Sequence, residues 1–196
     1  MTLKLVIIVV CVLGFGLMAA WFLVPKFLEQ PSYEIIEKER EFEIRKYEAM
    51  LLQSVNVTGD QYSSLRKGFR PLASYIGAKR RDGDKISMTA PVMQALGDNH
   101  KDWIVSFSMP SKYTKTSLPD PSDKTLFTEE FEPSTAAVIR FSGRTDEKML
   151  LEKTKALLDW LQDTDYEIKS KPKYMFYNDP STPGFLRRNE VMVLIK

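Results

Sequence analysis

The chain has 196 residues, which gives room for one globular domain or two very small ones. Hydrophobic residues make up 43% and charged residues 28%, ordinary values that exclude a disordered or fibrous chain. The net charge of +2 arises from interspersed acids and bases, so we expect no nucleic-acid partner. The only cysteine is Cys11, near the N-terminus, which excludes disulfides and cysteine-based sites elsewhere.

The first predicted element is an apolar segment, residues 5–24, which follows a short N-terminal tail, residues 1–4. It contains no charged residue over its twenty positions. As a helix it would span roughly 30 Å, the thickness of the hydrocarbon core of a bilayer. Trp21 stands near its end, where interfacial aromatic residues are common. We expect residues 5–24 to form a single transmembrane anchor.

Two properties of this segment stay open. A cleaved signal peptide is the alternative to an anchor, because Ala19 and Ala20 are small enough to precede a cleavage site. The flanking positive charges do not decide the orientation. A short tail followed directly by a long apolar stretch is typical of a signal-anchor. On that ground we expect the following domain on the exported side, periplasmic or extracytoplasmic.

A linker with two prolines, residues 25–31, leads to the folded domain, residues 32–196. Alternating apolar and polar residues predict three strands in its first part, around 33–35, 42–44 and 51–57.

The next predicted element is a helix that begins at its N-cap Asp60 and ends at Ile76. Its apolar residues follow at spacings of four, three and four, and so share one face: Leu65, Phe69, Leu72 and Ile76. Pro71 is unfavourable there, because an interior proline removes a helix hydrogen bond. Two strands are predicted after the helix, Lys85–Gln94 and Trp103–Met109.

The second half of the domain repeats this order. A helix is predicted from Thr145 or Asp146 to about Gln162, with a buried face made of Leu150, Thr154, Leu157 and Leu161. Two strands precede it and two follow it: 125–132, 135–142, 173–177 and 191–196. Residues 191–195 are apolar on both faces, which predicts an interior strand.

These patterns predict an α+β fold. Two like halves would pair into one domain with a curved antiparallel sheet and two helices packed on it.

The sequence contains no recognisable catalytic or metal site. His100 is the only histidine and has no cysteine or second histidine with which to share a metal. Two carboxylate pairs are better explained as a solvated strand face and a turn: Glu130 with Glu132, and Asp82 with Asp84. Neither a nucleophile elbow nor a phosphate-binding glycine loop is present. We therefore expect a binding protein rather than an enzyme.

Two sequence blocks are specific enough to compare with known proteins, KISMTAPV at 85–92 and RRNEV at 187–191. Together they resemble a known family, the SOUL haem-binding proteins. Further blocks resemble the same family in the same order: YEIIEKEREFEIRKYEA at 33–49, WIVSFSMPSKYT at 103–114, LPDPSD at 118–123, AVIRFSG at 137–143 and YNDPSTPGFLRRNEVMVLI at 177–195. The resemblance covers nearly all of residues 32–196.

The resemblance implies duplicated strand-helix-strand-strand halves that form a distorted antiparallel β-barrel with two helices. It implies non-covalent haem or a related porphyrin as ligand, near the first helix and the loop before the last strand. Arg66, Phe69 and Ala73 match helix positions that face the pocket in family members, and Tyr177 matches a loop tyrosine. An apolar surface with a nearby cation suits haem, which has a large apolar face and two propionates.

The resemblance has one departure, at Lys46. Some animal members carry a histidine there, which is proposed to coordinate the iron. A lysine amine must first lose its proton, which is unfavourable near pH 7 without strong burial. The axial ligand is therefore open, and the substitution weakens the case for iron coordination more than the case for apolar porphyrin binding.

The function we expect is haem buffering, transport or sensing at a membrane. The alternatives are an interaction or sensing module that binds another apolar ligand or a protein partner, and a hydrolase-like activity on the same fold.

Overall fold

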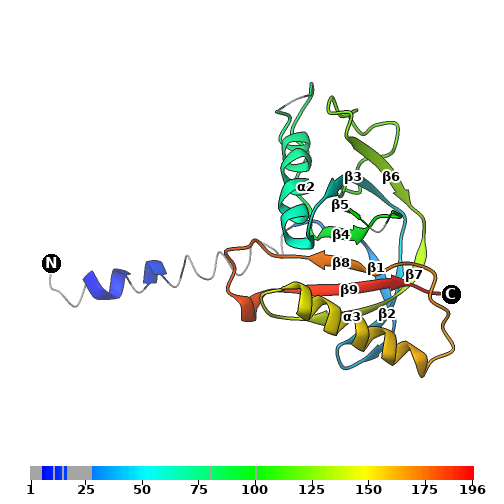
Figure 1. Ribbon diagram of the computed structural model, residues 1–196. Helices are drawn as coiled ribbons and strands as arrows, with labels where there is room; N and C mark the ends of the chain where they lie inside the picture. Colours follow the sequence, from blue (N-terminus) through cyan, green and yellow to red (C-terminus); the bar gives the residue numbers. More distant parts are fainter. Residues whose placement is uncertain (1–5, 11, 15, 17–27, 80, 100) are drawn as a thin grey trace.

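The computed structural model describes residues 6–10, 12–14, 16, 28–79, 81–99 and 101–196 (Figure 1). Most of the predicted anchor, residues 5–24, lies outside the described residues, as do the tail and the first three residues of the linker, 25–27. The described positions between 6 and 16 are helical. In the described part of the chain, no helix has the length and apolarity needed to cross a membrane.

The domain is built on one sheet of nine strands, in the order β1-β2-β7-β9-β8-β4-β5-β3-β6. All eight strand pairs are antiparallel. The strands are β1 (Tyr33–Glu39), β2 (Phe42–Tyr47), β3 (Met50–Thr58), β4 (Val92–Leu96), β5 (Asp102–Ser108), β6 (Leu126–Phe131), β7 (Ser134–Phe141), β8 (Lys173–Phe176) and β9 (Asn189–Leu194). The predicted α+β class with antiparallel pairing is confirmed.

The two halves of the sheet exchange strands. The first half contributes β3, β5 and β4, the second contributes β7, β9 and β8, and the halves meet where β4 pairs with β8. Each half also sends one strand to the other: β2 of the first half pairs with β7, and β6 of the second half pairs with β3. The predicted duplication is therefore present, in an interlocked form.

Two helices of equal length cover the sheet, α2 (Gln61–Ile76) and α3 (Glu147–Gln162). Each begins at an aspartate whose carboxylate accepts a hydrogen bond from the third backbone N–H that follows, Asp60 from Ser63 and Asp146 from Met149. Pro71 lies inside α2 without ending the helix. Both predicted helices are confirmed.

Both helices pack on the same face of the sheet. One core cluster joins α2 to Val105 and Phe107, and another joins α3 to Ile139 and Val191. A third cluster contains no helical residue and includes Met93, Met175 and Met192, which alternate along their strands with residues of the other two clusters. We call these surfaces the helix face and the helix-free face.

Two predictions about the sheet are corrected. The strand predicted at Lys85–Gln94 begins only at Val92, because Pro91 lacks an N–H and Thr89 instead donates its hydroxyl proton to the Ser108 carbonyl, 2.6 Å away. The expected β-barrel is an open, curled half-barrel, because β1 and β6 lie at the two ends of the sheet and do not pair with each other (Figure 1). The last strand, β9, lies between β7 and β8 with five of six residues buried, as predicted.

Candidate functional site

The solvent face of α2 combines aromatic and cationic side chains. Arg66, Phe69, Arg70 and Ala73 follow at helical spacing on this face. Phe69 lies at its edge, exposed rather than buried with Leu72 and Ile76, the residues with which the sequence pattern grouped it. The Phe69 side chain is 40% exposed, and its ring meets the buried Phe107 ring edge to face at 5.3 Å. Phe69 is thus anchored at its inner edge and open to a ligand at its outer edge.

The positive charge on α2 is not neutralised by its own helix. The helix sequence contains Arg66, Lys67 and Arg70 and no acidic residue. Lys67 donates to the Thr58 carbonyl at 3.4 Å, whereas Arg66 and Arg70 have no hydrogen-bond or ion-pair partner among the described residues. Like charges one turn apart cost a helix about 0.2–0.5 kcal/mol. This face is therefore suited to an anion.

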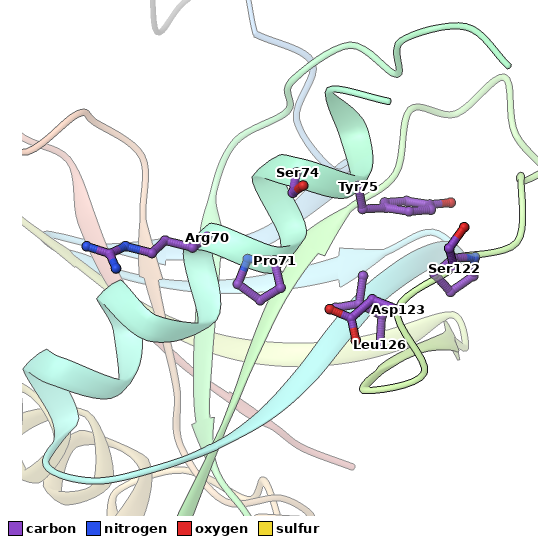
Figure 2. Close-up of a pocket in the computed structure, with 8 residues that line it drawn as sticks. Arg70, Pro71, Ser74, Tyr75, Ser122, Asp123 and Leu126 are labelled. Carbon is purple, nitrogen blue, oxygen red and sulfur yellow. The ribbon is translucent and has the colours of Figure 1, made fainter. Parts of the chain in front are cut away.

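A small cavity of about 230 Å³ lies beside this face, between α2 and the loop before β6 (Figure 2). It is lined by Arg70, Pro71, Ser74, Tyr75, Pro121, Ser122, Asp123 and Leu126. Tyr75 joins the loop to the helix, since its hydroxyl donates to the Pro119 carbonyl at 2.6 Å. The Arg70 side chain extends away from Tyr75 and Ser122 (Figure 2). The cavity is below the usual range of ligand pockets, about 300–1,000 Å³, and can take only part of a large ligand.

A second groove, of about 330 Å³, has the opposite charge. It lies between residues 29–32, 48–51, 108–115 and 130–132. Four glutamates line it with a single basic residue: Glu29, Glu48, Glu130 and Glu132, with Lys115. Lys115 already pairs with Glu130 at 3.3 Å. An anionic ligand would be repelled here and attracted to α2.

A buried ion cluster occupies the helix-free face. The Arg45 guanidinium, with no exposed surface, donates two hydrogen bonds to the Glu190 carboxylate at 2.8 and 3.0 Å. Its Nε donates to Glu43 at 2.7 Å and one Nη donates to the Tyr47 hydroxyl at 3.0 Å. The bidentate pair joins β2 to β9, on opposite sides of β7, and so ties the two halves together.

Tyr177 belongs to this cluster. Its hydroxyl donates to Glu190 at 2.9 Å, and the Arg188 guanidinium lies 3.7 Å above its ring. Arg188 also donates to Glu190 at 2.9 Å. The Tyr177 phenol is therefore buried and fully engaged, on the sheet face opposite α2.

The cluster changes the acidity of its members. Burial alone would raise the pKa of Glu190, but the hydrogen bonds and charge of Arg45, with Arg188 and the Tyr177 hydroxyl, lower it below its usual value. Burial and the Glu190 charge raise the pKa of Tyr177 well above its usual value. At neutral pH the cluster contains charged carboxylates and a protonated phenol.

Lys46 lies neither on α2 nor in the buried ion cluster. It is exposed on β2, where its register partners are Thr135 and Glu34. Strand alternation directs it to the face opposite Arg45. The five predicted ligand-binding residues therefore separate into an α2 group (Arg66, Phe69 and Ala73), the buried Tyr177 and the exposed Lys46.

The structure adds residues that the sequence analysis did not select. Arg70 lies on the same face of α2. The absence of acidic residues from 61–76 could have indicated from the sequence that this helix has an uncompensated positive charge. Arg45 and Glu190 stand in the blocks EIRKY and RRNEV, but nothing local indicated that they are buried partners. The described residues contain no group of three or more His, Cys, Asp or Glu side chains that could hold a metal; His100 lies outside them.

The architecture defines a class of duplicated α+β domains with a curled antiparallel sheet and one helix in each half. The family model described as SOUL heme-binding protein matches residues 28–194, and the chain belongs to this family. No curated protein matches the chain.

Solved structures share the fold at low identity. The C-terminal domain of EcmrR is similar with a TM-score of 0.60 and 14% identity, over 84% of this chain and 98% of that one. A hydrolase from Listeria innocua is similar with a TM-score of 0.56 and 12% identity, over 82% of this chain and 94% of that one. These likenesses concern the fold alone.

Proposed function

We propose that this domain binds haem or a related tetrapyrrole on the solvent face of α2. The observation that carries the proposal is the exposed Phe69 ring beside two arginines, Arg66 and Arg70, that have no partner among the described residues. Membership of the SOUL heme-binding family gives the ligand class.

The residues of this face suit the two parts of the ligand. Phe69 and Ala73 offer an apolar surface to the flat macrocycle, and each arginine can pair with a propionate carboxylate. The acidic groove would repel the same carboxylates, which favours α2 over the larger groove. When bound, haem would supply an iron centre; the residues of α2 would hold and orient it.

Neither Lys46 nor Tyr177 is a direct contact in this proposal. Lys46 lies on β2, away from α2, and Tyr177 is held by Glu190 on the helix-free face. Binding would then depend on apolar contact and charge pairing rather than on a strong axial ligand.

The role we propose is binding without catalysis, for buffering, transport or sensing of haem near a membrane. Residues 5–24 would tether the domain on the exported side. Because haem is flat and largely apolar, it partitions into bilayers, and a tethered domain would meet its ligand at their surface.

A hemin titration of the full chain, followed by the Soret band, tests the proposal. The parent should give a saturable Soret shift at micromolar hemin. We expect Arg66→Ala and Arg70→Ala each to weaken binding about 5- to 10-fold, the equivalent of about 1 kcal/mol for a half-exposed ion pair. Phe69→Ala should weaken it at least as much, because it removes the apolar contact.

The matched control is Arg140→Ala, which removes an exposed arginine from β7 rather than α2. It should leave the hemin affinity unchanged. A parent titration without saturation would disprove haem binding, and an equal loss in the Arg140 control would disprove the α2 site. An apolar ligand without iron or porphyrin that copurifies with the chain would favour the alternative ligand class.

A further inference from the structure

We propose that the loop between β8 and β9, residues 177–188, is a membrane-contacting tip whose Phe185 enters the lipid interface. This inference rests on the membrane tether of the proposed function and is independent of haem. Its partner is the headgroup and upper acyl region of a bilayer.

Phe185 projects from the loop into solvent. Its side chain is 78% exposed, the most of any large hydrophobic residue in the described part of the chain. It lies in the short 3-10 helix Gly184–Leu186, none of whose residues is buried. Because its ring is exposed, Phe185 contributes little hydrophobic stabilisation to the fold.

The loop is braced so that this position is fixed. The Arg187 guanidinium donates to the carbonyls of Thr182, at 2.8 Å, and Pro180. The Asn178 side chain accepts from the Arg188 backbone at 2.7 Å. A neighbouring loop supports the tip, because the Gly143 N–H donates to the Gly184 carbonyl at 3.0 Å. Phe185 is therefore held outward on an ordered base rather than left on a loose loop.

A cation stands beside Gly184, the residue that precedes Phe185. The Arg144 side chain runs along Gly184, with its Cγ 3.2 Å from where a Cβ would lie. Arg144 is exposed and has no hydrogen-bond or ion-pair partner among the described residues. The two acids of these loops are already engaged, Asp179 with Ser181 and Asp146 with the start of α3. A phenylalanine beside an uncompensated arginine suits the interface, where the ring meets acyl chains and the guanidinium meets lipid phosphates.

The tip lies near the point where the chain enters the domain. Arg188, at the base of the loop, donates to the Gln30 side chain at 3.0 Å and to the Tyr33 hydroxyl at 3.3 Å. Only five residues, 25–29, separate Gln30 from the end of the apolar segment 5–24. A fully extended stretch of this length reaches about 17 Å, so a tethered domain would keep this loop close to the bilayer.

The test uses the full chain reconstituted in nanodiscs that contain lipids with a quencher in the upper acyl chain. Cys11→Ser removes the only native thiol, and Pro183→Cys places an environment-sensitive fluorophore two residues before Phe185. We expect its emission to shift to the blue and to be quenched. Phe185→Ser in the same background should abolish both effects, because the ring holds the tip in the lipid.

Asp82→Cys is the control, in the bend that follows α2; the end of α2 and the β8–β9 connection lie apart in Figure 1. A label there should report water. Carbonate extraction of the same protein tests separately whether the chain is anchored in the membrane. If the chain is not anchored, the fluorescence of the label is measured after anionic vesicles are added to the protein. A label at 183 that reports water in a membrane-held chain or with those vesicles, or that is unaffected by Phe185→Ser, overturns the inference. Hemin binding should be unaltered in Phe185→Ser, so failure here and failure of the haem proposal remain distinguishable.

Discussion

Arg45 is the residue whose surroundings differ most from what its position in the sequence suggests. It lies in a strand of alternating polarity, yet its guanidinium is completely buried between Glu43 and Glu190. Removing such charges from water costs several kcal/mol per ion, which close pairing and further hydrogen bonds must offset. Tyr47 and Tyr177 donate or accept the remaining hydrogen bonds. The cluster is therefore stable only as a complete set.

Glu190→Gln should strongly destabilise the domain. The change leaves the buried Arg45 and the half-buried Arg188 with one carboxylate fewer, and breaking a buried pair costs about 3–5 kcal/mol. Urea unfolding followed by circular dichroism measures the loss as a lower midpoint. Glu130→Gln is the control, since its pair with Lys115 is exposed and should contribute less than about 1 kcal/mol. Similar urea midpoints for the two variants would contradict the expected contribution of the buried ion cluster to the stability of the domain.

The same carboxylates should make stability fall in acid. Burial opposes ionisation of both carboxyls, but their partners lower the pKa of each in the folded state: Lys38 and Arg45 act on Glu43, and Arg45 and Arg188 act on Glu190. A lowered folded pKa gives stabilisation that is complete above the unfolded value, about 4.3, and is lost as the pH falls through the folded value. The free energy of unfolding should decline below about pH 4.5, and Glu190→Gln should show a smaller decline.

This cluster could not have been predicted from local sequence. Glu43 and Arg45 alternate with the apolar Phe42 and Ile44, a pattern that normally indicates a solvated strand face. Their partner Glu190 lies 145 residues away from Arg45 in the chain. Only the pairing of distant strands brings the charges together.

At the scale of elements, α2 packs against β5 at unusually short range. A Cβ added at Gly68 would lie 2.6 Å from Val105, closer than real side chains approach. Gly68 is fully covered in the centre of the buried helix face. The missing side chain at this position sets the distance between helix and sheet.

Gly68→Ala should therefore destabilise the domain, although alanine is about 1 kcal/mol better than glycine within a helix. The expected net loss is about 1–3 kcal/mol, because the helix must move away from a packed sheet. In the double variant with Val105→Ala, the combined loss should be smaller than the sum of the two single losses. A more stable Gly68→Ala variant would show that helix propensity, rather than close packing, decides at this position.

The helices were more predictable than the strands around them. Asp60 acts as an N-cap as predicted, and Asp146 is the cap of the two candidates, Thr145 and Asp146, since a cap depends on contacts only three residues long. The strand predicted from Lys85 failed because its first residues make other contacts: the Ile86 N–H donates to the Ile76 carbonyl and the Ala90 N–H to the Glu29 carbonyl. Arg66, Phe69 and Ala73 were selected from the family resemblance and are proposed ligand contacts. The separation of Tyr177 and Lys46 from them required the three-dimensional structure.

At the scale of the whole molecule, the repeat in the sequence predicted two halves but not their exchange of strands. Pairing β2 with β7 joins residues nearly a hundred positions apart, which no local pattern encodes. Each half also has a tryptophan that contacts the other half. Trp160 of α3 stacks on Phe42 of β2 at 4.9 Å, and Trp103 of β5 lies 6.3 Å from Tyr174 of β8.

Interlocked halves should unfold together. Neither half can retain its sheet after the other is lost, since each would forfeit an outer strand and the shared β4–β8 pair. Single-tryptophan versions test this: Trp21→Phe with Trp103→Phe leaves Trp160 as reporter, and Trp21→Phe with Trp160→Phe leaves Trp103. In each version, fluorescence and far-UV circular dichroism should give the same urea midpoint and the same slope. Comparing two probes within one variant removes the stability change caused by the substitution itself. A fluorescence midpoint displaced from the circular dichroism midpoint in either version would mean that one half unfolds independently of the other. The exchange of β2 and β6 would then not make the two halves a single cooperative unit.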